Sequence, residues 1–257
     1  PGNESELRGL PDNGAGSGDN VAFLPLDDLR LSRSLDELVA RRSAFLTEYQ
    51  DAAYARRYTD LVAKVRSAEN IKAPGSTALT EAVARYFFKL MAYKDEYEVA
   101  RLYADPTFWA KVDARFEGDY SVRFHLAAPL LARPDPNTGH IAKRAFGPGM
   151  MRVFRVLARL KGLRGTRWDL FGYTAERRAE RALITEYEAD VAEVLDSLGD
   201  DRLPLALDIA RLPEGIRGFG HVKAAAMQSA AKQRRALLAR WRSAQPTPAA
   251  QRERVAA

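Results

Sequence analysis

Five basic side chains form the most distinctive candidate binding site in the 257-residue sequence. They are Lys143, Arg144, Arg152, Arg155 and Arg159. The last three recur at steps of three and four residues, so a helix would place them on one narrow stripe. Positioned arginines bind phosphate or carboxylate through charge-assisted, often bidentate hydrogen bonds. The sequence therefore predicts a contact with an anion or an acidic partner at this stripe.

The five residues belong to a longer basic stretch. Residues 141–178 hold ten lysines and arginines and two acids, a net +8, which leaves −2 for the rest of a chain whose total is +6. A solvated face with local ion pairs is the alternative interpretation of such a stretch. Nucleic acid is the less favoured partner, because no nucleic-acid-binding motif accompanies the charge.

The other residue types that do chemistry form no recognisable constellation. The histidines at 125, 140 and 221 lack the spacing of a zinc site, so structural roles are expected for them. Carboxylates adjacent on a helix point apart and cannot share a site. We expect Lys94, Asp95, Glu96 and Glu98, which lie near two tyrosines, to form a polar helix junction. No catalytic residue is predicted.

Composition excludes several classes of site. The chain has no cysteine, which rules out disulfides, thiolate zinc sites and iron–sulfur clusters ligated from within it. No stretch approaches the roughly 20 apolar residues of a membrane helix, and no signal-peptide layout opens the sequence. We expect a soluble, cytoplasmic protein without membrane contact.

Hydrophobic spacing predicts a mainly α fold, a helical domain with a minor β element. A helical pattern starts at Ser34, with Ser34 and Glu37 as a capping box, and continues to residue 65 as one long helix or a kinked pair. Thr77 or Thr80 is expected to cap the next helix, and Thr174 a long helix over residues 175–198. Other helices are expected at 150–163, 203–212 and 222–241. The apolar face of the helix that carries the basic stripe is assigned to Val153, Phe154, Leu157 and Leu160.

The helical period fails between residues 119 and 133. Apolar side chains alternate with polar ones from Tyr120 to Leu126, a pattern typical of a strand, which we expect within 119–131 and at least near 120–127. Because a lone strand leaves its edges unpaired, a partner is expected elsewhere in this chain or in another domain. The prolines and glycines of residues 133–149 predict a long loop that acts as an interface or gating element.

Three regions are expected along the chain. Residues 1–31 are predicted to be a flexible linker, because the first 20 hold five glycines, two prolines and almost nothing apolar. Residues 32–244 form the helical domain, and residues 245–257 a disordered tail. We expect the chain, which begins with Pro1, to be a piece of a longer protein; a tag or cloning scar is the competing explanation.

Three stretches together resemble one protein family. They read YKDEYEVARLY at residues 93–103, RFHLAAPLL at 123–131 followed by FGPGMM at 146–151, and IRGFGHVK at 216–223. Their order and content resemble the C-terminal region of the fused bacterial indolepyruvate ferredoxin oxidoreductases, over roughly residues 32–242. The resemblance attaches no mechanism to these stretches, and it transfers no catalytic residue.

The resemblance implies a parent enzyme that oxidatively decarboxylates aryl 2-oxoacids such as indolepyruvate to acyl-CoA, with ferredoxin as electron acceptor. It implies thiamine diphosphate, magnesium and 4Fe-4S clusters in upstream domains and no cofactor in this segment, which alone is expected to be inactive. The implied partners are the upstream domains, a second protomer of a homo-oligomer, ferredoxin and CoA.

In that setting the basic stripe has three candidate partners: the CoA phosphates, acidic ferredoxin, or an acidic surface of the enzyme itself. We favour an acidic surface of the enzyme itself, because the apolar face of the same helix is expected to pack against the rest of the protein. The alternative function is an autonomous helical interaction module whose basic helix binds an acidic protein or nucleic acid.

Overall fold

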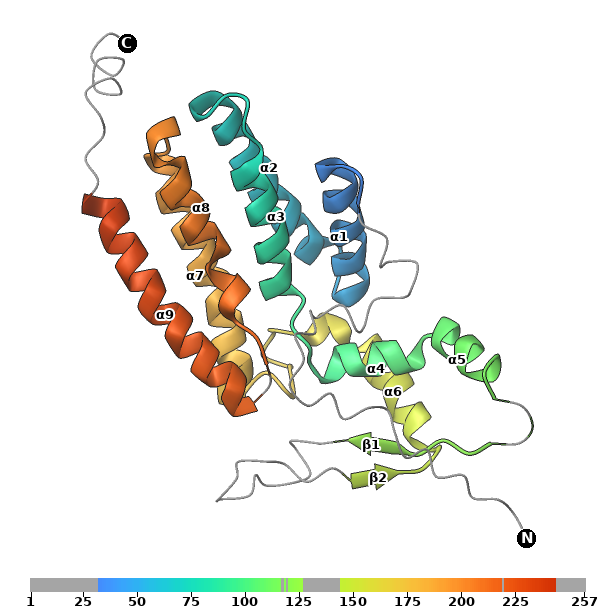
Figure 1. Cartoon of the computed structure of the whole chain (residues 1–257). Helices are drawn as coiled ribbons and strands as arrows, with labels where there is room; N and C mark the ends of the chain where they lie inside the picture. Colours follow the sequence, from blue (N-terminus) through green and yellow to red (C-terminus); the bar gives the residue numbers. More distant parts are fainter. Residues whose placement is uncertain (1–31, 117, 119, 127–143, 219, 244–257) are drawn as a thin grey trace. The chain divides into compact units, whose positions relative to one another are not determined.

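The computed structural model of the chain describes residues 32–243, apart from 117, 119, 127–143 and 219. The chain divides into two units, Pro1–Arg33 and Ser34–Ala257, and only residues 32 and 33 of the first are described. The described residues form nine α-helices and one two-stranded antiparallel sheet (Figure 1). The predicted mainly α fold with a minor β element is therefore confirmed, while the predicted linker 1–31 and tail 245–257 lie outside the described residues.

The first helical stretch is a pair of helices. α1 (Leu35–Tyr49) begins after Ser34, whose hydroxyl accepts the backbone N–H of Glu37 at 3.1 Å, as the capping pattern predicts. α2 (Ala52–Lys72) begins after Asp51, whose extended backbone and capping carboxylate start a new helix. The alternative of a single long helix is thereby excluded.

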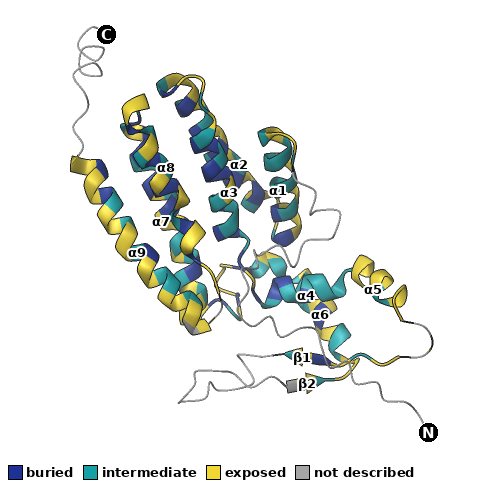
Figure 2. Cartoon of the chain, in the orientation of Figure 1, coloured by how far each residue is buried: buried dark blue, intermediate teal, exposed yellow. Residues whose placement is uncertain are grey.

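Six helices enclose the larger hydrophobic core. They are α1, α2, α3 (Ala78–Met91), α7 (Ala175–Asp196), α8 (Leu203–Arg211) and α9 (Gly220–Ser243). The buried residues line the inner sides of these helices (Figure 2). Phe87 of α3 stacks between Tyr58 of α2 and Tyr187 of α7, with ring centroids 6.1 and 5.8 Å away. Both tyrosine hydroxyls donate to backbone carbonyls, so their burial leaves no unpaired hydroxyl.

A buried carboxylate of α2 caps α3. Glu69 is fully buried and accepts the backbone N–H groups of Leu79 at 2.9 Å and Thr80 at 2.8 Å. It also accepts the hydroxyls of Ser76 and Thr80. Thr77 occupies the N-cap position, one of the two predicted, but its side chain makes no capping bond, and the Glu69 carboxylate caps the helix instead. A charged carboxylate is the stronger acceptor at the positive end of a helix.

A smaller core lies among the remaining elements. They are α4 (Glu96–Ala104), α5 (Pro106–Asp113), β1 (Phe124–Leu126), β2 (Arg144–Phe146) and α6 (Met150–Arg159). Ala100, Phe124 and Phe154 are buried together. The ring of Tyr103 stacks on Phe154 with centroids 5.0 Å apart and packs edge-on against Phe124. This core is aromatic and much smaller than the helical one.

The sheet corrects two predictions. β1 covers only residues 124–126, because residues 120–122 are not in a strand and residues 127–131 lie outside the described part. It pairs antiparallel with β2, and Phe124 lies opposite Phe146. The partner is therefore a segment of this chain. Since β2 lies within residues 133–149, the prediction of a loop throughout that region is wrong at its C-terminal end, and residues 133–143 are not described.

Short 3-10 segments join several helices. η3 (Lys161–Leu163) follows α6, η4 (Asp200–Arg202) precedes α8, and η5 (Leu212–Gly215) follows it. The predicted cap of α7 is confirmed, since the Thr174 hydroxyl accepts the N–H of Arg177 at 3.2 Å. None of the helices in the described ranges combines the length and hydrophobicity that crossing a membrane requires.

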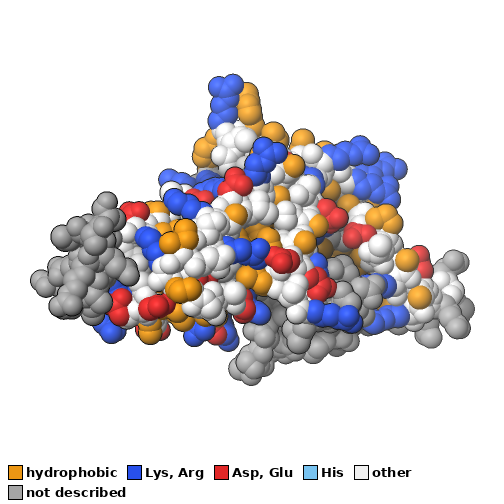
Figure 3. Space-filling model, turned by 90° about the horizontal axis from the view of Figure 1, so that it is seen from above, with side chains coloured by type: hydrophobic (Ala, Val, Ile, Leu, Met, Phe, Trp, Pro, Cys, Tyr) orange, Lys and Arg blue, Asp and Glu red, His pale blue; other side chains and the backbone are white. Residues whose placement is uncertain are grey.

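Ion pairs at the surface join α7 to its neighbours. Arg57 of α2 lies 2.5 Å from Glu188, and Arg234 of α9 donates two hydrogen bonds to Asp190. On the face seen in Figure 3, basic and acidic side chains are interspersed with hydrophobic ones. The pair of Arg57 with Glu188 is partly exposed, and pairs of that kind contribute at most about 1 kcal/mol each, whereas the carboxylate of Asp190 is buried.

Candidate functional site

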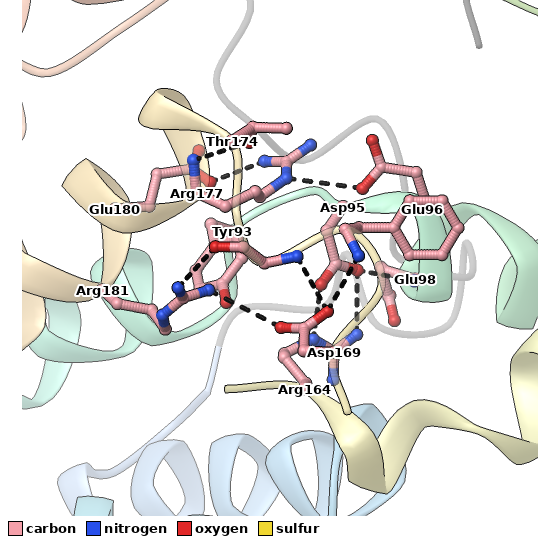
Figure 4. A network of polar contacts seen from close by, with 12 residues as sticks. Tyr93, Asp95, Glu96, Glu98, Arg164, Asp169, Thr174, Arg177, Glu180 and Arg181 are labelled. Carbon is pink, nitrogen blue, oxygen red and sulfur yellow. Dashed lines mark hydrogen bonds and ion pairs between the residues drawn. The ribbon is translucent and has the colours of Figure 1, made fainter. Parts of the chain in front are cut away.

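A buried ionic network lies where the loop before α4 meets the loop before α7 (Figure 4). We define this network as Asp95, Glu96, Arg164, Asp169, Arg177, Glu180 and Arg181. Its centre is the pair Arg164 and Asp95, both almost fully buried. Arg164 donates from Nε to Oδ2 at 2.5 Å and from Nη2 to Oδ1 at 2.9 Å. Bidentate geometry of this kind fixes both side chains in one orientation.

Arg164 also holds the end of α1. Its Nη1 donates to the backbone carbonyl of Tyr49 at 2.6 Å, and its guanidinium carbon lies 3.7 Å from the centroid of the Tyr49 ring. Asp95 in turn caps α4, because it accepts the N–H of Glu98 at 2.8 Å. Burial tends to lower the pKa of the Arg164 guanidinium, but the hydrogen bonds and charge of Asp95 outweigh it and raise that pKa. Arg164 is therefore a permanent buried cation.

A second arm of the network crosses from α4 to α9. Arg177 lies 3.4 Å from Glu96 and donates to Glu180 at 2.6 Å. Lys223 of α9 reaches the other oxygen of Glu180. Burial, which Arg177 only partly offsets, raises the pKa of the Glu96 carboxyl above its ordinary value. This arm joins three helices through alternating charges.

The third arm organises the loop before α7. Asp169 is buried and accepts the N–H groups of Gly165 at 2.7 Å and Gly172 at 3.0 Å. Arg181 lies 3.6 Å from the same carboxylate and donates to the carbonyl of Gly172 at 2.6 Å. A Cβ at position 172 would lie 2.3 Å from an oxygen of Asp169, so only glycine fits there.

The network is a structural joint. Each carboxylate in it faces a cation or backbone N–H groups. Within the described part of the chain, no group of three metal-ligating residues comes together. The predicted polar junction at residues 94–98 is confirmed for its three acids: Asp95 pairs with Arg164, Glu96 with Arg177 and Glu98 with Arg101.

The predicted basic stripe lies on the exposed side of α6. Arg152, Arg155 and Arg159 are all exposed, and none forms an ion pair with another residue that the structure describes. Val153 and Val156 are 44% and 55% exposed on the same helix. The assignment of Val153 to the apolar face is therefore wrong, and the stripe has valines beside it.

Of the other predicted site residues, most lie outside the described set. Lys143 lies outside the described residues, and Arg144 belongs to β2 but its side chain is not described. His125 is exposed on β1, opposite the buried Phe124, as the alternation predicts. His140 and the side chain of His221 are also outside the described set. The structure thus brings together three of the five predicted basic residues.

Sequence reasoning missed the central pair and one surface. Asp95 and Arg164 are 69 residues apart, and Arg164 was one of ten basic residues in a continuous stretch. The loop before α7 exposes Trp168, Leu170 and Tyr173. In the sequence, these residues alternate with Asp169 and Phe171, and that alternation is the signal of an exposed surface. Sequence reasoning misses it because the segment lies between two expected helices, where a loop is expected.

Comparison with known proteins gives one match. Residues 35–236 match the model of a "Family of unknown function (DUF6537)". No curated protein and no solved structure matches the chain. The matched residues run from the start of α1 into α9 and include the whole buried ionic network.

We expect the pair of Arg164 and Asp95 to matter more for the unfolding free energy than an exposed arginine does. Replacing Arg164 with methionine (Arg164→Met) leaves Asp95 buried without its cation, which we expect to lower the unfolding free energy by about 3–5 kcal/mol. The double variant Arg164→Met with Asp95→Asn should recover much of this loss, because asparagine still caps α4 and needs no cation. Urea unfolding measures all three values. Arg155→Met, at an exposed arginine, is the control, and an equal loss in that control would contradict the role of the pair.

The raised pKa of Glu96 predicts a specific pH dependence. Between the ordinary carboxyl pKa and the raised one, the folded state binds more protons than the unfolded state, so this residue's contribution to stability falls as pH rises. Glu96→Gln should therefore gain stability relative to the unsubstituted protein as pH rises above the ordinary carboxyl pKa of about 4. The exposed Asp60→Asn is the control for losing one negative charge. A difference that stays flat or reverses with pH would exclude the expected shift.

Proposed function

The chain belongs to the DUF6537 family, and we propose that it is the C-terminal accessory domain of a large oxidoreductase. The parent enzyme, a cytoplasmic homo-oligomer, depends on thiamine diphosphate, magnesium and 4Fe-4S clusters. It decarboxylates aryl 2-oxoacids such as indolepyruvate to acyl-CoA and passes the electrons to ferredoxin. This segment positions other parts of that enzyme and performs no step of the reaction.

One observation supports this proposal above others: the three stretches that resemble such oxidoreductases are physically connected. The first supplies Asp95 and Glu96 of the buried ionic network. The second supplies β1, Phe146 of β2 and the start of α6, and Phe124 of β1 packs against α4 in the smaller core. The third supplies Lys223, which reaches Glu96 through Glu180 and Arg177. The first and third stretches thus take part in or contact the buried ionic network, and the second packs against the first in the smaller core.

The chemistry of the side chains agrees with an accessory role. The sequence contains no cysteine, so iron–sulfur clusters do not fit this chain and belong to other domains. The carboxylates of the network are engaged by internal partners, whereas the arginines of the basic stripe and two aromatic side chains, Trp168 and Tyr173, are exposed. Surfaces of this composition suit recognition of other proteins.

A second function is favoured by one specific observation. Three exposed arginines on α6 have no carboxylate partner among the described residues, and exposed valines lie beside them. An autonomous interaction module would use this face to bind an acidic protein, with nucleic acid as the less favoured partner. The two functions differ in what the native polypeptide contains besides this segment.

The test of the first function is the size and cofactor content of the native protein. We expect a polypeptide longer than 257 residues that contains iron and thiamine diphosphate and reduces ferredoxin with indolepyruvate and CoA. The isolated segment is the control and should bind neither, with no absorbance near roughly 400 nm and far less iron than one cluster per chain. A native polypeptide of 257 residues without cofactors would contradict the proposal and favour the autonomous module.

The basic stripe gives a further prediction about the parent enzyme. Replacing Arg152, Arg155 and Arg159 with glutamine should change the stability of the segment by less than about 1 kcal/mol, because the side chains are exposed. If the stripe contacts an acidic surface of the enzyme, the same variant weakens assembly in the parent. Glutamine at Lys232, Arg235 and Arg240, exposed positions of α9, is the charge-matched control. Unchanged assembly with a raised CoA requirement would contradict the internal contact.

A further inference from the structure

The loop between η3 and α7 exposes three large hydrophobic side chains. Trp168, Leu170 and Tyr173 are 64%, 62% and 64% exposed. No other six-residue stretch of the described residues exposes three large hydrophobic side chains. Scattered apolar residues are normal on a protein surface, but a cluster of large ones marks an interaction site. We call these three residues the aromatic loop patch.

The loop points its polar residue inward and its apolar residues outward. Asp169 is 3% exposed and binds the backbone of the loop from within. Phe171 packs edge-on against Tyr97 at 5.1 Å, so positions 169 and 171 face inward while 168 and 170 face solvent. This inverts the usual distribution of residue types. A loop whose only role is to connect two helices does not require this arrangement of polar and apolar side chains.

Internal bonds hold the patch in one geometry. The Tyr173 hydroxyl donates to the carbonyl of Arg167 at 2.6 Å, which closes the loop from one end to the other. Gly165 has a φ of 76°, and Gly172 leaves no space for a Cβ. The loop therefore cannot turn the patch inward without breaking its contacts with Asp169. A loop whose backbone is fixed before binding loses less entropy on association than a flexible one.

The charge of the loop selects the kind of partner. Its one acid, Asp169, is buried, whereas the guanidinium of Arg167 lies 5.1 Å from the centroid of the exposed Trp168 ring. No carboxylate of the described residues pairs with Arg167. A complementary surface offers carboxylates at the border of an apolar pocket. A symmetric contact with the same loop of a second copy would bring two Arg167 side chains together.

The size of the patch indicates a reversible partner. Permanent interfaces are large and strongly apolar, whereas three side chains with an adjacent cation resemble the centre of a smaller, transient interface. A lipid surface is fluid and does not require side chains held in a fixed arrangement. We propose that the aromatic loop patch docks a separate protein through an apolar pocket bordered by carboxylates. This inference does not depend on the proposed oxidoreductase.

Photo-crosslinking of the native protein tests the proposal. A benzophenone amino acid at position 170, with Trp168 and Tyr173 retained, should crosslink a separate protein, and peptide mapping should locate the adduct at an acid-bordered apolar site. Adducts with a second copy, with another region of the same polypeptide, with lipid alone, or no adduct would overturn it.

Affinity measurements with the crosslinked protein, once purified, give the quantitative test. Trp168→Ala should weaken binding at least about tenfold, and Arg167→Gln should flatten the salt dependence of association. Gly172→Ala keeps all three side chains but disturbs the loop, so it should also weaken binding. Phe116→Ala, which removes an exposed aromatic ring elsewhere, is the matched control. Equal affinity of the Trp168 and Phe116 variants would refute the patch as the docking site.

Discussion

The ion pair between Arg164 and Asp95 is the constraint on which the arrangement of the described residues depends. It sits where the larger helical core and the smaller aromatic core adjoin, and all three guanidinium nitrogens of Arg164 and both carboxylate oxygens of Asp95 take part in hydrogen bonds. A buried pair contributes little net stability, because removing two charges from water offsets most of their attraction. The pair instead fixes the orientation of the elements that it joins. If Arg164 were displaced, the end of α1 and the Asp95 carboxylate that caps α4 would both lose their partner.

The positions of the acidic and basic side chains follow from this constraint. The buried acids Asp95, Asp169 and Glu180 belong to the network, and Glu69 caps a helix; backbone N–H groups or cations face each of them. Lysines serve the opposite helix ends: Lys72 donates to the carbonyl of Leu195 at the end of α7, and Lys161 to that of Glu48 near the end of α1. Arginines without an internal acid then remain at the surface. The outcome is a fold suited to contact other molecules through its exterior.

Helices and their local caps follow directly from the sequence. Ser34 and Thr174 cap through neighbours three residues away, and the period of apolar residues gives the helix extents to within a few positions. The cap by Glu69 comes from another helix, so no local pattern signals it. β2 is three residues long and lies in a region rich in proline and glycine. It is too short for an alternation of polar and apolar residues to be recognised. The pairing of Asp95 with Arg164 was hidden for another reason: ten cations were available, and only tertiary packing selects one.

The three tryptophans of the chain lie in three separate environments. Trp241 is buried in the larger core with the guanidinium of Arg202 3.7 Å from its ring centroid, Trp109 donates to the carbonyl of Tyr103 beside the smaller core, and Trp168 is in water. Indole emission shifts with the polarity of its surroundings, and each ring experiences a different polarity. Variants that retain one tryptophan at a time would therefore follow the melting of either core, or the solvation of the loop, as separate optical signals.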